Sequence, residues 1–555
     1  MKAFRILPAT LAFVATAAHI SVNSTYPVFL NGINLLSASA AEIATALSTG
    51  NTTSLQLVDA YIARIEANNH QGLELRAIIK VAPTAREIAH QLDLERAAGN
   101  VRSPIHGLPI VVKDNYNTDV ELGMNTTAGS YALLQSQAKG DAFVISKLRA
   151  AGALILGKAN LDEVSFGKPG HSVYDLINDQ FAGIRGSVTS AWSGRGGQCQ
   201  SAYVFGGFAA GGDPSGSSGG SAVAVSAGFA AAALGTDTEG SVISPSNRAA
   251  LFSLRPSTGI TSRSGVVPIS SSQDTTGVMA KSVWDVAAIF EVMAAHDPED
   301  AYSAPAEPFR RENYTQFLGD DGFQGLRIGI PREPFWNQTA EGYRSAINAG
   351  LEATFEKMRA LGATIIDPVV LPNAEDWKYT FVGGAVRNSN GTVIIQYDVK
   401  ADMAQYLTTK RTNTTNLETL GDIISFNDAH ADLEFPPGYC CQDTLVAANE
   451  LGQRDTSGEY WYAKWVQQQL NEEGIEYLFR EYGLDLLLVP SEGGASRLGA
   501  VGRCPVGTVP VGYDEINLPY GMAFVGKRYD EPSVLRAMSA FEAHFPPRAV
   551  PPTLY

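Results

Sequence analysis

The stretch at residues 216–241, GSSGGSAVAVSAGFAAAALGTDTEGS, joins two glycine-rich segments through an apolar run. Each glycine-rich segment contains a serine, Ser217 in the first and Ser241 in the second. Glycines beside a serine let backbone N–H groups approach a reacting oxygen closely, because no Cβ blocks conformations with φ > 0. The apolar run from Ser221 to Leu234 is built of small residues and predicts a tightly packed core helix.

Strand patterns and helix patterns alternate on both sides of this stretch. An apolar run at Pro109–Val112 ends at Lys113 and is typical of a buried strand. Similar runs occur at 153–156, 326–330, 363–366 and 484–489, with helices predicted over 54–69, 282–295 and 340–361. Such alternation predicts an α/β chain. No internal repeat or change of composition requires a domain boundary.

Composition and charge exclude several classes of protein. The chain has 555 residues, 45% of them hydrophobic, and a formal charge of −16 with acidic and basic residues interspersed. The absence of a Lys/Arg cluster argues against nucleic-acid binding, and a negative surface argues against anionic membranes. Neither Cys-x-x-Cys nor His-Glu-x-x-His occurs, so we expect no metal and no cofactor.

The N-terminus has the pattern of a secretory signal. Lys2 and Arg5 precede an apolar segment at 6–18, and Ala15-Thr16-Ala17 fits a cleavage site. The apolar segment is shorter than a membrane span, and no later segment qualifies as one. We therefore expect a signal peptide at 1–18 and a secreted glycoprotein. Candidate glycosylation sites are Asn23, Asn51, Asn125, Asn313, Asn337, Asn390 and Asn413, although Asn125 lies close to a conspicuous motif and we expect it to be too buried for a glycan.

Four cysteines allow three pairings into two disulfides. They are Cys199, Cys440, Cys441 and Cys504. Because Cys440 and Cys441 are adjacent, we expect each of them to bridge to a distant partner.

Two serines and a lysine offer a nucleophile, a proton relay and a base. Gly-x-Ser-x-Gly at 216–220 also fits a nucleophile elbow with Ser218 as the nucleophile. That elbow needs a strand immediately before it, whereas Ala209–Pro214 is loop-like, and nothing locates the downstream Asp and His. A phosphate-binding loop would need Gly-x-x-x-x-Gly-Lys-Ser/Thr, which is absent.

An ordered series of motifs resembles the amidase signature family, serine hydrolases with a Ser–Ser–Lys triad. The resemblance runs from about Leu55 to the C-terminus. Its motifs are Gly107–Asp114, Thr126–Ser130, Leu156–Asn160, Trp192–Gln198, Gly216–Ser221, Gly235–Ser241, Leu254–Gly259, Ser272–Thr275 and Ile516–Glu531. It implies one large α/β/α domain around a mixed twisted sheet at 19–555, with a signature core at about 105–280. A variable substrate-specificity region is expected at about 297–480.

The resemblance also implies roles for individual residues. Ser241 would be the nucleophile that forms an acyl-ester, Ser217 the relay in a cis peptide, and Lys113 the base. Lys113 must then be neutral, which burial favours; pairing with Asp114 is the alternative role for this lysine. The backbone N–H groups of Thr238, Glu239, Gly240 and Ser241 would hold the oxyanion, with Ser217 also at the substrate. Ser218 and Asp237 would support the loops, and Asp274 is expected to be structural.

Two positions depart from the common pattern of the family. Many members have Gly-Gly-Ser-Ile-Arg around the nucleophile, whereas this chain has Glu239 before Gly240 and Ile243 in place of the arginine. A side chain at 239 requires a backbone conformation that accepts a Cβ. The peptide-amidase-like branch of the family shares both departures. Arg248 is the cation that we expect beside Asp237 in place of the missing arginine.

The sequence therefore predicts a secreted amidase that hydrolyses linear carboxamides and releases ammonia or an amine. Its partner would be a small-molecule amide, with no nucleic acid, no membrane span and a possible homodimer. An acyl or amide transferase and an esterase of the same family are alternatives. A secreted binding protein derived from an amidase is a third possibility.

Overall fold

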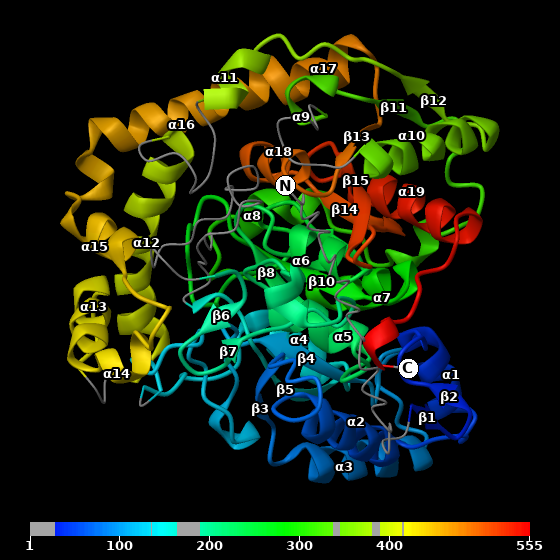
Figure 1. Ribbon diagram of the computed structural model, residues 1–555, viewed down its shortest axis with the longest axis vertical. Helices are drawn as coiled ribbons and strands as arrows, with labels where there is room; N and C mark the ends of the chain where they lie inside the picture. The colour runs from blue at the N-terminus through cyan, green and yellow to red at the C-terminus, as the bar shows by residue number, and fades with distance from the viewer. Residues whose placement is uncertain are drawn as a thin grey trace, which may run out of the picture.

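A single mixed sheet of eleven strands organises the chain. The computed structural model describes residues 28–134, 136–163, 189–336, 345–379, 389–412 and 416–554. The strand order is β12-β11-β13-β15-β14-β9-β10-β8-β4-β5-β3. The predicted α/β fold around a mixed sheet is confirmed (Figure 1).

The centre of the sheet holds the strands that lead to the predicted site. Strands β4 (Pro109–Lys113) and β8 (Ala232–Asp237) are parallel neighbours, and β5 (Leu154–Ala159) lies parallel to β4 on its other side. Strand β10 (Thr275–Ala280) pairs antiparallel with β8, and β9 (Phe252–Arg255) pairs with β10. All five strands are buried along their whole length, as their apolar runs indicate.

The outer strands complete the sheet on both sides. One side ends at β3 (Ile78–Val81). The other side consists of β14 (Val506–Tyr513), β15 (Pro519–Gly526), β13 (Leu486–Pro490), β11 (Arg327–Gly329) and β12 (Thr364–Ile366). The predicted strands at 326–330, 363–366 and 484–489 thus join the same sheet as the predicted signature core.

Helices cover both faces of the sheet. Helices α5 (Gly219–Ser226) and α6 (Ile243–Arg248) pack on one face, while α7 (Val283–Met293) and α19 (Glu531–His544) pack on the other. Helix α2 (Ser54–Asn68), predicted over 54–69, begins at a capping box in which Thr53 and Gln56 bond reciprocally. Helix α10 (Ser345–Ala360) falls within the predicted helix at 340–361, whose first residues lie outside the described ones.

A lobe of helices stands at one side of the sheet (Figure 1). We call the segment 389–470 the helical lobe. It is built from α12 (Asn390–Lys410), α13 (Leu420–Ala429), α14 (Ala431–Glu434), α15 (Asp443–Glu450) and α16 (Gly458–Leu470). Met403, Tyr406 and Ile423 of the lobe form a small apolar core with residues that follow β4 and β5, such as Leu133 and Leu161.

The predicted core helix at 221–234 is wrong in its extent. Helix α5 ends at Ser226, and β8 begins at Ala232. The chain reverses at Gly228, which has φ +67°. Small apolar residues suit a buried helix and a buried central strand equally, so periodicity does not separate the two.

The predicted disulfides are also wrong. Cys440 and Cys441 bridge to each other, whereas Cys199 and Cys504 are free and buried. Each buried thiol is enclosed where it stands, with Cys504 Sγ 3.5 Å from the carbonyl of Leu498. Neither buried thiol therefore forms a disulfide with Cys440 or Cys441, which lie nearer the surface on the helical lobe.

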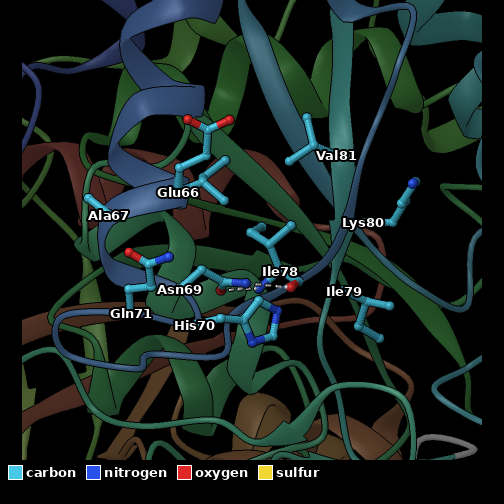
Figure 2. A pocket seen from close by; sticks show the side chains of 10 residues that line it. Glu66, Ala67, Asn69, His70, Gln71, Ile78, Ile79, Lys80 and Val81 are labelled. Atoms are coloured by element: carbon cyan, nitrogen blue, oxygen red, sulfur yellow. Dashed lines mark hydrogen bonds between the residues drawn. The ribbon is translucent and has the colours of Figure 1, made fainter.

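A surface pocket of about 650 Å³ lies between α2 and the edge strand β3 (Figure 2). The side chain of Asn69, which lines the pocket, bonds both backbone groups of Ile78, at 2.8 and 2.9 Å. Glu66, His70 and Lys80 also line it. None of the predicted site residues lines this pocket. Among the described ranges, no helix is long and apolar enough to cross a membrane.

Gly220 packs against backbone, which makes it a test of this arrangement. A Cβ at Gly220 would collide with the carbonyl oxygen of Asn160 and would lie 2.6 Å from that of Ala77. We expect Gly220→Ala to lower the free energy of unfolding by about 1–3 kcal/mol, because neither backbone atom can move away cheaply. Thermal and urea unfolding measure the loss.

The matched control for that substitution is Gly458→Ala. Gly458 is exposed at the start of α16, and a Cβ there meets nothing within 4 Å. It should be neutral or stabilising by about 0.5 kcal/mol. Equal stability of the two variants would contradict the close packing of α5 against the end of β5.

Candidate active site

Lys113 and Ser217 meet in the core, although they are 104 residues apart in the chain. Lys113 is the last residue of β4, and its Nζ donates to Ser217 Oγ at 2.6 Å and to Thr236 Oγ1 at 3.0 Å. Because β4 and β8 are parallel, their carboxyl ends lie at the same edge of the sheet. The lysine therefore lies beside the strand that leads to Ser241.

Ser217 lies in a loop that is packed against the end of β5. The Gly216–Ser217 peptide is cis, as the family resemblance implied. The carbonyl of Ser217 accepts the N–H of Asp162 at 3.1 Å. A Cβ at Gly216 would collide with the carboxylate of Asp162, so a larger residue here would require that side chain to move. The carboxylate of Asp162 in turn accepts the N–H of Ala191.

Ser218 joins the two glycine-rich segments. Its N–H donates to the carbonyl of Ser241 at 3.2 Å, and its hydroxyl donates to the carbonyl of Thr236 at 3.2 Å. Ser218 is completely buried, whereas Ser241 retains 8% exposure. The segment before Ser218, 213–217, contains no strand. Both observations disfavour the nucleophile elbow with Ser218 as the attacking residue.

The carboxylate of Asp237 holds the loop that carries Ser241. Its Oδ1 accepts the N–H of Gly240 at 2.8 Å, and its Oδ2 accepts the N–H of Val242 at 2.7 Å. Gly240 has φ +96°, a conformation that favours glycine, and the half-buried Glu239 precedes it. Because the Gly240 N–H donates to Asp237, that group is already engaged within the loop.

The cation beside Asp237 is Arg255, and the prediction that Arg248 fills this place is wrong. Arg255 Nε lies 3.0 Å from Asp237 Oδ1, and both side chains are buried. Arg248 instead pairs with Glu492. Arg255 is the last residue of β9, and the order of strands in the sheet brings it beside Asp237. Arg248 is the last residue of α6 and lies elsewhere. The separation of each arginine from Asp237 along the chain does not indicate which of the two contacts it.

Burial sets the charge state of Lys113. Removal from water lowers the pKa of Lys113 to about 7, while the carboxylates of Asp162, Asp237 and Asp274 oppose the shift. The alternative ion pair between Lys113 and Asp114 does not form. Asp114 Oδ1 lies 3.4 Å from Lys158 Nζ, and Asp114 Oδ2 accepts the N–H groups of Thr127 and Gly129.

Several residues of this region were not predicted as site residues. Thr236 contacts Lys113, and Asn115 Nδ2 donates to the same Thr236 hydroxyl at 2.9 Å. Asp162 contacts the Ser217 loop. Thr236 lies within the quoted motif Gly235–Ser241, and that position was the available signal. Asp162 follows the motif at 156–160 and gave no signal of its own.

Asp274 has the structural contact that was expected of it. Its carboxylate accepts the hydroxyl of Thr238 at 2.6 Å, and it is buried. The contact ties the start of β10 to the loop that carries Ser241.

The candidate glycosylation sites fall into two groups. Asn51, Asn125 and Asn313 are exposed and Asn390 is half-buried. Asn125 is therefore not buried as expected, although its Nδ2 donates to the carbonyl of Leu134 at 2.7 Å. Asn23, Asn337 and Asn413 lie outside the described residues, as does the predicted signal peptide at 1–18. Within the described ranges, no three His, Cys, Asp or Glu side chains gather as metal ligands would.

Comparison with known proteins gives a consistent picture. The amidase family model matches residues 56–181 and 207–503. A probable amidase of Arabidopsis thaliana is 33% identical over 540 residues, covering 96% of this chain and 94% of that protein. The similarity therefore extends over nearly the whole chain and includes both serine segments.

Solved structures agree with these sequence matches. The native peptide amidase from Stenotrophomonas maltophilia superposes with a TM-score of 0.80 at 32% identity, covering 93% of this chain and 98% of that one. An amidase family protein from Bacillus anthracis superposes with a TM-score of 0.79 at 28% identity, covering 93% of this chain and 92% of that one. The chain belongs to the amidase family and is an amide hydrolase.

Proposed function

We propose that this amidase cleaves linear carboxamides through a triad of Ser241, Ser217 and Lys113. The observation that carries the proposal is the 2.6 Å bond from the buried Lys113 amine to Ser217 Oγ. The bond from Ser218 N–H to the Ser241 carbonyl, 3.2 Å, brings the second serine segment to the first. The proposed proton path then runs from the nucleophile Ser241 through the relay Ser217 to the base Lys113.

The proposed reaction has two halves. Neutral Lys113 takes a proton from Ser217, which takes one from Ser241 as its Oγ attacks the amide carbon. When the tetrahedral intermediate collapses, the C–N bond breaks and the proton returns through Ser217 to the leaving nitrogen. Ammonia or an amine leaves, and an acyl-ester remains on Ser241. Water then cleaves this ester with the same relay, giving a carboxylic acid and free Ser241.

Backbone N–H groups of the 238–241 loop are the proposed donors to the oxyanion. The Gly240 N–H is the exception, because it donates to Asp237. Preorganised donors of this kind stabilise negative charge that develops only in the transition state. Asp237 and Arg255 fix the loop before substrate binds, so no reorganisation is required during the reaction.

We also propose that the protein is secreted. The proposal rests on the basic and apolar pattern of residues 2–18 and on the exposure of Asn51 and Asn313. Expression in a secreting eukaryotic host should place the full chain in the medium with glycans on these two asparagines. The chain without residues 1–18 should stay in the cells unglycosylated. Equal export of both chains would contradict a signal in this segment.

Removal of the nucleophile or the base should abolish hydrolysis. We expect Ser241→Ala and Lys113→Met each to lower kcat by about 10⁴-fold or more, because the relay then lacks an end. Steady-state release of ammonia from a panel of carboxamides measures the loss. Retention of full activity by folded Ser241→Ala would contradict the mechanism.

Two control variants match these substitutions. Ser226→Ala removes a buried hydroxyl that bonds the Val223 carbonyl inside α5. Lys281→Met removes a lysine that burial also shifts to a pKa of about 7 and that donates to the carbonyls of Leu35 and Ala38. Both controls should lower stability while kcat stays within about twofold.

The rate should rise with pH through the pKa of Lys113. A base acts when it is deprotonated, and burial lowers the Lys113 pKa from its ordinary 10.5 to about 7. We expect kcat/KM to increase about tenfold per pH unit below pH 7 and to level above it. Lys281→Met should show the same profile, which separates the two buried lysines. A steady decrease from about pH 6 to 9 in folded protein would exclude a lysine base.

A further inference from the structure

A chain of hydrogen bonds connects the helical lobe to the loop that carries Ser241. It begins at Asp398, a buried residue of α12. Both oxygens of this carboxylate are in use. Oδ2 accepts the hydroxyls of Ser270 at 2.6 Å and Ser272 at 2.7 Å, while Oδ1 accepts Tyr460 Oη at 2.9 Å and Arg454 Nη1 at 3.1 Å.

Asp402, one helical turn later, holds the residue between those two serines. Its Oδ2 accepts the N–H of Ser271 at 2.7 Å, and its Oδ1 accepts Arg454 Nη1 at 2.7 Å. Arg454 thus lies between two carboxylates that would otherwise repel each other in the interior. Together the two aspartates fix three successive residues, 270–272, from the side of the lobe.

The same segment contacts the Ser241 loop on its other side. Asp274 Oδ2 accepts the N–H groups of Ile269 and Ser270, at 2.9 and 3.0 Å, and its Oδ1 accepts Thr238 Oγ1 at 2.6 Å. A second connection runs through Arg255, which donates to the carbonyl of Gln273 and to Asp237, both at 3.0 Å. The segment 269–274 therefore sits between the lobe and the nucleophile loop.

We propose that Asp398 is a positioning residue for amide hydrolysis, acting through Ser270, Ser272, Asp274 and Thr238 on the Ser241 loop. This inference rests on the proposed function. In Figure 1 the lobe lies at the rim of the molecule, while β8 and β10 lie at its centre. Asp398 touches neither serine of the triad, and its effect passes through segment 269–274.

The chemistry of the side chain explains why a carboxylate is needed. All four partners of Asp398 are donors, and Ser270 Oγ also lies 3.0 Å from Ser272 Oγ. An asparagine of the same shape presents a donor where two of these donors must bond, so it leaves buried groups unsatisfied. The segment then shifts, and a displacement of about 1 Å near a reacting group costs about 10²-fold in rate.

The test compares Asp398→Asn with Asp285→Asn. Asp285 is an equally buried carboxylate that accepts the N–H groups of Ala40 and Ala41, at 2.9 and 3.0 Å, away from the triad. We expect Asp398→Asn to lower kcat by about 10- to 100-fold while KM changes less than about threefold. Asp285→Asn should lower the melting temperature comparably and leave kcat within about twofold. Equal kcat losses in both variants, or an unchanged kcat in Asp398→Asn, would overturn the proposal.

A double-mutant cycle with Thr238→Val identifies the route. If the effect passes through Thr238, the loss of kcat in the double variant is clearly smaller than the product of the single losses. Losses that multiply would overturn the route. If Asp398→Asn does not fold, Ser272→Ala removes only one of the four bonds and should lower kcat by about two- to fivefold. An unchanged kcat in that folded variant would also overturn the proposal.

The outcome is separable from that of the proposed function. Activity in Ser241→Ala would refute the triad whatever Asp398 does. An inactive Ser241→Ala together with a fully active Asp398→Asn would refute only the positioning role.

Discussion

The amine of Lys113 in contact with the hydroxyl of Ser217, inside the core, is the constraint on which the rest of the site depends. A charged lysine is costly there, so burial favours the neutral form that can accept a proton. Three carboxylates around it limit that shift. The parallel pairing of β4 and β8 places the amine at the edge where the Ser241 loop begins. The same strand pairing therefore both buries Lys113, which favours its neutral form, and places its amine beside the Ser241 loop.

Close packing explains the glycines as much as backbone freedom does. Gly216 lies against the carboxylate of Asp162, and Gly235 lies against Ser218, where a Cβ would stand 2.7 Å from its hydroxyl. At Gly240, by contrast, a positive φ is what favours glycine. That distribution explains why Glu239 is accommodated: the residue in the left-handed conformation is its neighbour. The first glycine of the commoner family pattern is therefore not required by the backbone here.

The helical lobe belongs to the region with the fewest motifs, yet its carboxylates reach the segment beside the loop that carries Ser241. Asp398 and Asp402 lie in α12, and both pair with Arg454, which begins the short 3-10 helix Arg454–Thr456. Their partners Ser270 and Ser272 precede β10, which pairs with β8. A part of the chain with few motifs is thus hydrogen-bonded to a part with many.

Local patterns in the sequence were sufficient for the α/β class, the helix that begins at Ser54, the strand ending at Lys113 and the order of motifs that indicates the family. These features depend on residues that are close together along the chain, and the spacing of apolar residues indicates them directly. Only the tertiary structure decided that Arg255 and not Arg248 faces Asp237, that Cys440 bridges to Cys441, and that Asp398 reaches Ser270. Each of these is a contact set by strand order, helix packing or local backbone geometry, which residue types alone do not specify.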